Sequence, residues 1–192
     1  MSRWEPNARE RLERAAVELF VEQGFAETTV PQITARAGLT TRTFFRHFAD
    51  KREVLFAADE EIPDFAEQFL AEAPPALGPM AVIAEGLEKV AAARFEGRLD
   101  YLRTRRAVIQ ADEGLREREL RKLSALAEAM QRGFRRRGLD DLAAMLAAQL
   151  AATVLSVTIT RWLDQDGADQ PLSALVRDTL RALRSLAADP SA

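Results

Sequence analysis

Between Gly38 and Phe48 the chain combines hydrogen-bond donors and cations with three phenylalanines. Gly38 is typical of a turn, and Thr40 can cap the helix that follows by accepting a hydrogen bond from a free amide in its first turn. That helix carries aromatic rings on one side and short hydroxyls, guanidinium groups and an imidazole on the other. Such groups suit the base edges and phosphates of a DNA major groove. The pattern therefore predicts a recognition helix.

Individual residues of this stretch have competing interpretations. Arg42 is the leading candidate for base readout, because a guanidinium can donate two hydrogen bonds to a guanine edge. The alternatives for Arg42 are a phosphate contact or an arginine that only meets solvent. His47, the only histidine, is as a lone histidine most simply a surface residue, and a catalytic role is not favoured because no nucleophile–base pair or metal cluster accompanies it. Phe44 and Phe48 are expected to anchor the helix in the core rather than to stack on bases.

Composition excludes several classes of protein. The chain lacks cysteine, which excludes disulfides, thiolate zinc sites and cysteine nucleophiles and suits a reducing cytoplasm. Asp112 and Glu113, without a nearby histidine, are more simply charges at a helix N-terminus than metal ligands. We therefore expect no catalytic residue, no metal and no cofactor. We also expect no signal peptide and no membrane partner, on the interpretation that no apolar run approaches the roughly 20 residues of a span.

The charge is unevenly distributed. The net charge of −3 over 192 residues argues against nucleic acid when taken alone. Residues 1–52 hold nine Lys or Arg against seven Asp or Glu, whereas residues 53–192 hold eighteen against twenty-three. This basic excess is too small to identify a DNA-binding surface by itself. Arg135–Arg137, the densest basic run, is interpreted as cations at a helix C-terminus rather than as a second nucleic-acid patch.

Leu and Ala dominate and Gly is sparse, so the chain is expected to be all-α. Apolar residues at helical spacing predict nine helices. Pro63 is expected to kink or break the fourth, and Ala73–Pro79 is the clearest linker. The predicted division is a three-helix domain at residues 1–52 and a second helical domain at 53–192. The predicted helices lie near 7–23 and 30–37, from 40, from 50, and near 80–96, 99–110, 115–137, 139–164 and 172–187.

The N-terminal third resembles the TetR family of bacterial transcriptional repressors. The stretch Arg42–Phe48, with the region Arg103–Glu119, also resembles an actinobacterial subgroup that includes regulators sensing acyl-coenzyme A. The family resemblance runs from Arg11 to Leu55 and rests on many positions at fixed spacing. These positions are Ala15-Ala16, Leu19-Phe20, Gly24-Phe25, Thr28-Thr29-Val30, Ile33, Ala37-Gly38-Leu39, Thr43-Phe44-Phe45, His47-Phe48 and Lys51.

The resemblance implies a nine-helix TetR-like architecture, with an N-terminal helix-turn-helix DNA-binding domain and a C-terminal ligand-binding and dimerisation domain. Carried over position by position, it implies phosphate contacts at Thr29, His47 and Lys51. Phe45 stands where the family often has a tyrosine whose hydroxyl reaches a phosphate, so either Arg46 replaces that contact or the ring only packs. The residues expected to contact DNA are Thr29, Thr40, Thr41, Arg42, Thr43, Phe45, Arg46, His47 and Lys51.

The helices at about 139–164 and 172–187 have apolar faces suited to a four-helix bundle between two copies of the chain. The alternative is that both helices are core of one subunit. Pairing would let two recognition helices read a palindrome. The candidate ligand-binding residues, each of which can equally be plain core, are Phe65, Phe69, Phe95, Tyr101, Leu102, Arg106, Ile109, Met130, Phe134, Thr158 and Trp162.

We therefore expect a cytoplasmic, ligand-responsive transcriptional regulator. It would be a repressor that binds a palindromic operator in double-stranded DNA as a homodimer and is released by a small hydrophobic or amphipathic molecule. A helical enzyme is a competing hypothesis, which no nucleophile–base pair or metal cluster supports. An architectural DNA-binding protein without a ligand is another, and the weak basic charge argues against it because sequence-independent binding depends on neutralising many phosphates.

Overall fold

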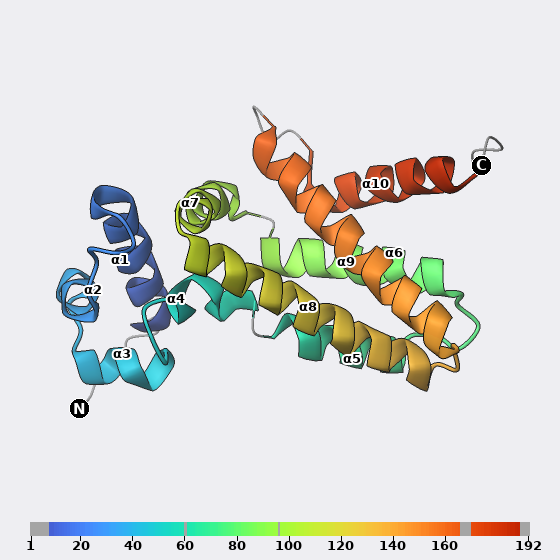
Figure 1. The fold of residues 1–192 in the computed structure, drawn as a ribbon, viewed down its shortest axis with the longest axis horizontal. Coiled ribbons are helices and arrows are strands. Elements are labelled where there is room, and N and C mark those ends of the chain that lie inside the picture. The colour runs from blue at the N-terminus through green and yellow to red at the C-terminus, as the bar shows by residue number, and fades with distance from the viewer. Residues whose placement is uncertain (1–7, 60, 96, 166–169, 189–192) are drawn as a thin grey trace. The chain divides into compact units, whose positions relative to one another are not determined.

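A computed structural model describes residues 8–59, 61–95, 97–165 and 170–188, and over these ranges it is helical without a strand. The predicted all-α class is confirmed, and Figure 1 shows the helices in chain order. A 3-10 turn (Ala57–Asp59) and a π-helical turn (Ala91–Phe95) accompany them. The ten α-helices of the described ranges are α1 (Ala8–Gln23), α2 (Val30–Ala37), α3 (Thr41–His47), α4 (Glu53–Phe56), α5 (Ile62–Glu72), α6 (Pro79–Val90), α7 (Leu99–Gln110), α8 (Glu113–Arg136), α9 (Asp141–Asp164) and α10 (Leu172–Ala187).

The difference from the nine predicted helices lies in the segment after Asp50. One helix interrupted at Pro63 is expected there, but the described residues form two helices, α4 and α5. The Asp50 carboxylate accepts hydrogen bonds from the amides of Arg52 and Glu53 at 2.8 and 2.9 Å. Pro63 lies in the first turn of α5, where its missing N–H has no intrahelical partner to lose. The proline therefore starts a helix instead of kinking one.

The chain forms two compact units. The first comprises Met1–Glu60 and Arg103–Glu119, and the second comprises Glu61–Leu102 and Leu120–Ala192. The first unit extends past the expected boundary at residue 52, because α4 packs on α1 and is bound by residues of α7 and α8. The division of roles between residues 1–52 and 53–192 stays a prediction.

The core of the first unit is built by α1, α2 and α3. Leu12 of α1, Ile33 of α2 and Phe44 of α3 are fully buried. The amide of Gly24 donates to the Phe20 carbonyl at the end of α1, with Gly24 at a φ of +87°. Positive φ costs glycine little, because it has no Cβ. The chain can therefore reverse sharply into α2.

Lys51 fixes the turn between α1 and α2 from a distant part of the sequence. Its Nζ donates to the carbonyl oxygens of Phe25, Ala26 and Thr28 at 2.7, 3.0 and 2.8 Å. The ammonium also lies 4.4 Å from the centroid of the Phe25 ring. Burial is the main cause of a lowered pKa for Lys51. All three N–H bonds of the ammonium are thus used inside the first unit.

Two arginines of the first unit hold α4. Arg105 of α7 donates to the carbonyl oxygen of Leu55, and Arg118 of α8 pairs with the carboxylate of Glu53. Their guanidinium carbons lie 5.3 and 6.0 Å from the centroid of the buried Phe56 ring. A guanidinium close to an aromatic face is attracted by the ring quadrupole. The four-residue helix α4 is therefore held by polar and aromatic contacts together.

In the second unit α9 packs on α10, and both pack on α6. The close approach of α5 to α8 depends on Gly133. A Cβ at that position would lie 2.5 Å from Cδ1 of Leu70, closer than real Cβ contacts allow. Gly133 and Leu70 are both buried. Because Gly133 has no side chain, α5 can pack closely against α8 at this point.

The basic run Arg135–Arg137 has partners within the second unit. Arg135 pairs with Asp141 at 2.7 Å, and Arg136 pairs with Glu67 at 2.9 Å. These contacts agree with the interpretation that the run is not a second nucleic-acid patch. Arg137 holds the linker that follows α5 by donating to the carbonyl oxygens of Leu70, Ala73, Pro74 and Leu77 at 3.0, 2.7, 2.9 and 3.2 Å.

The helix α9 contradicts the prediction that no apolar run of the chain approaches the length of a membrane span. It is long and apolar enough to cross a membrane by length and composition, with a window of mean hydropathy 2.0. The expectation that no run approaches a membrane span is therefore wrong, because no charged residue stands between Asp141 and Arg161. Of that window 39% is buried inside the protein, and the core helix of a soluble protein passes the same test. The finding is weak evidence for a membrane.

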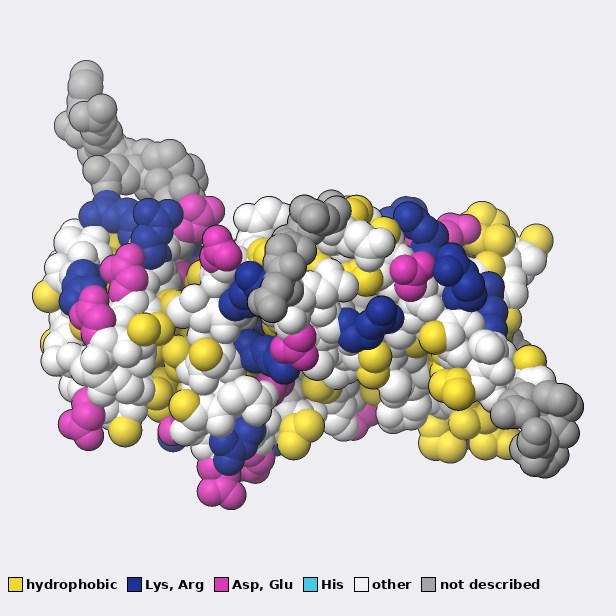
Figure 2. Space-filling view, turned by 90° about the horizontal axis from the view of Figure 1, so that it is seen from above, with side chains coloured by type: hydrophobic (Ala, Val, Ile, Leu, Met, Phe, Trp, Pro, Cys, Tyr) yellow, Lys and Arg dark blue, Asp and Glu magenta, His cyan; other side chains and the backbone are white. Residues whose placement is uncertain are grey.

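One side of α9 is apolar and exposed. Leu142, Met145, Leu146 and Val157 have exposed fractions of 62%, 43%, 57% and 44%. The first three recur at the three- and four-residue spacing that places side chains on one helix face. Figure 2 shows hydrophobic side chains gathered on part of the surface of the second unit. α9 therefore presents an apolar surface that its own subunit does not cover.

Substituting Lys51 tests its structural role. Lys51→Met is expected to lower the free energy of unfolding by about 1–2 kcal/mol, because three carbonyl oxygens lose a charged donor. Urea unfolding followed by circular dichroism measures the effect. Arg52→Met, at an exposed neighbouring position, is the control and should change stability by less than about 0.5 kcal/mol. Equal effects of the two substitutions would contradict the assignment.

Substituting Gly133 tests the contact between α5 and α8. Gly133→Ala is expected to lower the free energy of unfolding by about 1–3 kcal/mol, because the added methyl overlaps Leu70 in a packed interior. The gain in helix propensity, about 1 kcal/mol, offsets only part of this. Differential scanning calorimetry should show a lower melting temperature. Ser124→Ala, at an exposed position of α8, is the control; an unchanged melting temperature for Gly133→Ala would mean that the two helices separate there at no cost.

Candidate nucleic-acid interface and ligand cavity

α3 has a buried side that anchors it. Phe44 is fully buried and Phe48 nearly so, and their ring centroids are 5.3 Å apart. The hydroxyl of Thr40 accepts a hydrogen bond from the amide of Thr43 at 3.1 Å and lies 3.0 Å from the Thr43 hydroxyl. The expected cap and both expected anchors are present. They fix which side of this short helix faces outward.

The other side of α3 faces solvent. Thr41, Arg42 and Arg46 are exposed. Arg42 forms no hydrogen bond with any residue of the described ranges, so its donors are available to a base edge or a phosphate. Phe45 is 59% exposed, and its ring meets that of Phe44 edge-on at 5.4 Å. The exposed side of α3 therefore presents the hydrogen-bond donors of Thr41, Arg42 and Arg46 together with the apolar ring of Phe45.

His47 and Arg46 are adjacent at the end of α3. The Nη2 atom of Arg46 lies 3.4 Å from Nε2 of His47. Burial, and then the charges of Arg46 and Arg9, lowers the pKa of His47 below the usual 6.5. His47 is therefore mostly neutral at pH 7, so Nε2 can accept from Arg46 while Nδ1 donates. Such a pair can offer an anion donors from both side chains.

The turn between α2 and α3 is held by contacts to α1. Gly38 lies at a φ of +64°, which favours glycine. Arg11 donates to the carbonyl oxygen of Ala37 at 2.6 Å, and a Cβ at Gly38 would lie 3.1 Å from the same guanidinium. Arg36 donates two hydrogen bonds to Glu22 at 2.9 and 2.7 Å. The angle between the two helices is thus fixed from α1.

Thr29 and Lys51 lie near the start of α2, but their side chains make different hydrogen bonds within the protein. Thr29 is exposed and caps α2: its hydroxyl accepts from the Gln32 amide, while the Gln32 side chain accepts from the Thr29 amide. This reciprocal arrangement is a capping box. Lys51, half-buried, already donates to three carbonyl oxygens. A phosphate contact by Lys51 stays a prediction and would replace one of these bonds.

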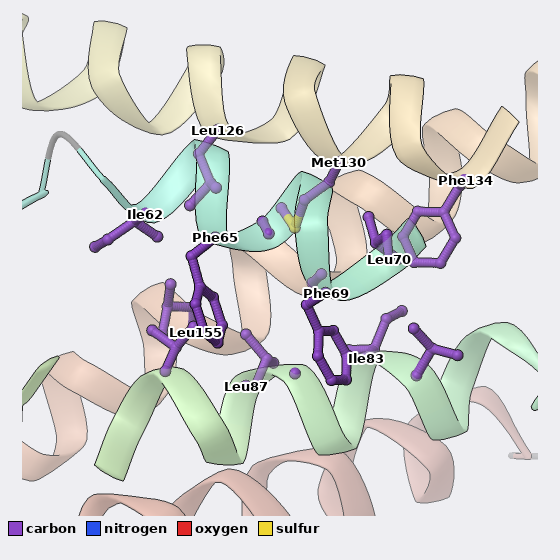
Figure 3. A pocket seen from close by; sticks show the side chains of 15 residues that line it. Ile62, Phe65, Phe69, Leu70, Ile83, Leu87, Leu126, Met130, Phe134 and Leu155 are labelled. Atoms are coloured by element: carbon purple, nitrogen blue, oxygen red, sulfur yellow. The ribbon is translucent and has the colours of Figure 1, made fainter. Parts of the chain in front are cut away.

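The second unit contains an apolar cavity between α5, α6, α8 and α9 (Figure 3). It holds about 460 Å³ of space, counted out to solvent at its open side. In Figure 3 Phe65 and Phe69 reach from α5 towards α6, while Leu126 and Met130 extend from α8. The cavity is lined by Ile62, Phe65, Ala66, Phe69, Leu70, Val82, Ile83, Gly86, Leu87, Val90, Leu126, Met130, Phe134, Ala151 and Leu155.

The structure brings part of the expected ligand-binding set to this cavity. Arg106 and Ile109 belong to the first unit instead, and the Thr158 hydroxyl donates to the Val154 carbonyl at 2.6 Å. The others away from the cavity pack in or against the core of the second unit: Phe95, Tyr101, Leu102 and Trp162. The expected residues that line the cavity are Phe65, Phe69, Met130 and Phe134.

Sequence reasoning missed the aliphatic part of the lining. Ile83, Leu87 and Leu155 follow the same helical spacing as ordinary core residues, so their pattern carries no signal for a cavity. Gly86 does carry one, because a glycine inside a helix is costly unless something packs closely against it. A Cβ at Gly86 would lie 2.9 Å from the Phe69 ring. This glycine therefore marks the place where α5 and α6 meet at the cavity.

The lining of the cavity is apolar, so the cavity can bind a ligand only by burying apolar surface. Its lining contains hydrocarbon side chains, a glycine and a methionine, without a titratable group. Among the residues that the structure describes, no three His, Cys, Asp or Glu side chains gather where they could hold a metal ion. The cavity can therefore bind an apolar group by removing it from water. It has no group that could transfer a proton.

Sequence comparisons concern mainly the N-terminal part. The family described as "Bacterial regulatory proteins, tetR family" matches residues 13–58. The HTH-type transcriptional regulator TcmR of Streptomyces glaucescens is 35% identical over 92 residues, which are 48% of this chain and 41% of that protein. The chain spans less than half the length of the curated relatives it matches. The match covers the helix-turn-helix described above.

Solved structures are similar over most of the chain. The transcriptional regulator FadR from Bacillus subtilis, in complex with stearoyl-CoA, has a TM-score of 0.56 at 21% identity, covering 91% of this chain and 96% of that one. The SmeT–triclosan complex has a TM-score of 0.57 at 21% identity, covering 91% and 90%. TcmR and FadR are transcriptional regulators and not enzymes, in agreement with the prediction for this chain. Residues 13–58, which contain the helix-turn-helix, therefore match the TetR family of bacterial regulatory proteins, and the all-helical fold of the chain is similar to that of TetR-family regulators.

Proposed function

We propose that the chain is a cytoplasmic, homodimeric repressor that binds a palindromic operator and is released by a small apolar or amphipathic molecule. The observation that carries the DNA-binding part is the division of α3 into two sides. Phe44 and Phe48 anchor the buried side, while Arg42 stands exposed with its donors unused in the described ranges. A helix so anchored can enter a major groove without giving up its own packing.

The DNA contacts follow from the position of each group. Arg42 reads a base, because its guanidinium can meet two acceptors on a guanine edge. Phe45 has no hydroxyl and packs on the sugar or a thymine methyl, since an exposed ring gains by leaving water. Thr40, Thr41 and Thr43 contact bases or phosphates. Thr29, Arg46 and His47 contact phosphates. Lys51 also contacts a phosphate, after one of its hydrogen bonds to a carbonyl oxygen is broken.

Pairing of two chains is supported by the exposed apolar side of α9. Leu142, Met145 and Leu146 are exposed on a helix whose other side is buried against its own subunit. Contiguous apolar surface of this kind marks an interaction site. α10, which packs on α9, would complete a four-helix bundle with the partner subunit. Two copies of α3 could then read both halves of a palindrome.

Response to a ligand is supported by the cavity of the second unit. FadR was solved with stearoyl-CoA and SmeT with triclosan, so the shared fold can accommodate molecules that have large apolar parts. α8 contributes Arg118 to the contacts of α4 and Met130 to the cavity lining. A ligand that binds two arrangements of α8 unequally would change the population of the DNA-binding arrangement.

Substituting Arg42 tests base readout. Sequences bound by the wild-type protein are first selected from random DNA. Arg42→Ala is then expected to weaken binding to them by about 1–3 kcal/mol and to relax preference at one base pair per half-site. Arg46→Ala is the control and should weaken all sequences alike, as loss of a phosphate contact does. A uniform loss for Arg42→Ala would assign it to phosphate, and failure to select any sequence would refute DNA binding.

Substituting Leu146 tests the homodimer. Leu146→Glu is expected to convert the protein from dimer to monomer at micromolar concentration, because a carboxylate would be buried against an apolar partner surface. Sedimentation velocity measures the change. Leu120→Glu, at a 66% exposed position of α8, is the matched control and should leave the dimer intact. A monomeric wild-type protein, or a dimer unaffected by Leu146→Glu, would contradict this interface.

A further inference from the structure

We propose that the cavity of the second unit takes an amphipathic anion, with the apolar part inside the cavity and the anionic end bound by Arg94. This inference rests on the proposed ligand binding and adds the charge of the ligand and the residue that recognises it. The cavity lining has no polar side chain. A charged group buried there would lose its hydration without gaining a partner. Any charge on the ligand must therefore lie outside the cavity.

A second, smaller hollow adjoins the cavity, and an arginine is among the residues that line it. It comprises about 170 Å³ between atoms, counted out to open solvent, and shares Ile62, Phe65 and Val90 with the lining of the cavity. Its two other residues are Ala93 and Arg94. Among the residues that line the cavity and the hollow, Arg94 is therefore the one with a charged group that a ligand extending beyond these three shared side chains could reach.

The backbone at Arg94 is unusual. Ala91–Phe95 forms a π-helical turn directly after α6. Such turns are rare and often occur at functional sites, because one extra residue shifts the side chains that follow. Here Val90, at the end of α6, lines the cavity, while Ala93 and Arg94 line the hollow beside it. The π-helical turn thus places Arg94 in the hollow that adjoins the apolar cavity lined by Val90.

The present partner of Arg94 is exchangeable. Its Nη2 atom donates to the Glu61 carboxylate at 2.7 Å, and the side chain of Glu61 is 63% exposed. Exposed ion pairs contribute little to stability. A carboxylate or phosphate of a ligand can therefore take the place of Glu61, and arginine binds both groups with two parallel hydrogen bonds.

A second cation stands near another part of the cavity wall. The Lys89 ammonium lies 4.7 Å from the centroid of the Phe69 ring, which lines the cavity. Glu88, the acidic neighbour on α6, is paired with Arg177 of α10 at 3.1 Å. Lys89 and Arg94 thus favour an anion over a cation at the outer end of the ligand.

Three amphiphiles of equal chain length test the charge preference. Dodecanoate, dodecanol and dodecyltrimethylammonium are titrated into the full-length protein below their micelle concentrations, and binding is measured by calorimetry. Wild-type protein is expected to bind dodecanoate about 3- to 10-fold more tightly than dodecanol, as suits one partly exposed charge-assisted contact. The cationic amphiphile should bind more weakly than dodecanol. Equal binding of all three would overturn the proposal.

Two charge variants locate the preference. Arg94→Gln is expected to abolish the difference between dodecanoate and dodecanol while leaving dodecanol binding unchanged. Arg135→Gln removes an arginine of a similar ion pair, with Asp141 at 2.7 Å, that does not line the cavity, and it should keep the wild-type preference. Glu61→Gln removes the competing carboxylate and should tighten dodecanoate binding alone. A preference that survives Arg94→Gln would overturn the assignment.

A cavity variant separates this proposal from the broader one. Gly86→Ala would place a Cβ 2.9 Å from the Phe69 ring and push that ring into the cavity. It is expected to weaken dodecanoate and dodecanol alike. If both amphiphiles bind equally well to wild-type and Gly86→Ala protein, the cavity is not the ligand site and the proposed ligand response fails. If Gly86→Ala weakens both but charge has no effect, only the role of Arg94 fails.

Discussion

Carbonyl oxygens at the ends of helices, and in the turns that follow them, are bound in this chain by cations from distant parts of the sequence. Lys51 binds three at the turn after α1, Arg11 binds that of the last residue of α2, and Arg137 binds four at the end of α5 and in the linker after it. A helix end buried without such partners would be destabilised. These contacts set the direction in which each following helix leaves, and so they determine where α3 and the cavity-lining helices lie within their own units.

The same contacts explain why charge says little about function here. Arg11, Arg36 and Lys51 are basic residues of the N-terminal part, yet each is bound to groups of the protein itself. Counting them all towards a DNA-binding surface overstates the hydrogen-bond donors that are available to DNA without breaking a contact of the protein. What distinguishes Arg42 from these three is its freedom from such bonds in the described ranges, which only the structure reveals. Net charge and the number of available donors are different quantities.

Local features were predictable from the sequence, whereas the cavity was not. The cap at Thr40 and the anchors Phe44 and Phe48 depend on neighbours a few residues away, so spacing sufficed. The cavity depends on how α5, α6, α8 and α9 meet, and its aliphatic lining has the same periodicity as a packed core. Large aromatic residues were poor guides for the same reason: Trp162 and Phe95 fill the core instead. The break before Pro63 was expected, but the separate helix α4 depends on Arg105 and Arg118, far along the chain.

The length of α3 has a consequence for engineering. It has seven residues, while isolated helices shorter than about 12–15 residues are marginal even in favourable sequences. A peptide of this segment would therefore be largely unfolded in water, and its side chains would not hold the spacing that a groove requires. The reading surface belongs to the whole first unit and is not portable as a fragment. New sequence preferences are better sought by exchanging the outward-facing residues in place than by grafting the helix onto another scaffold.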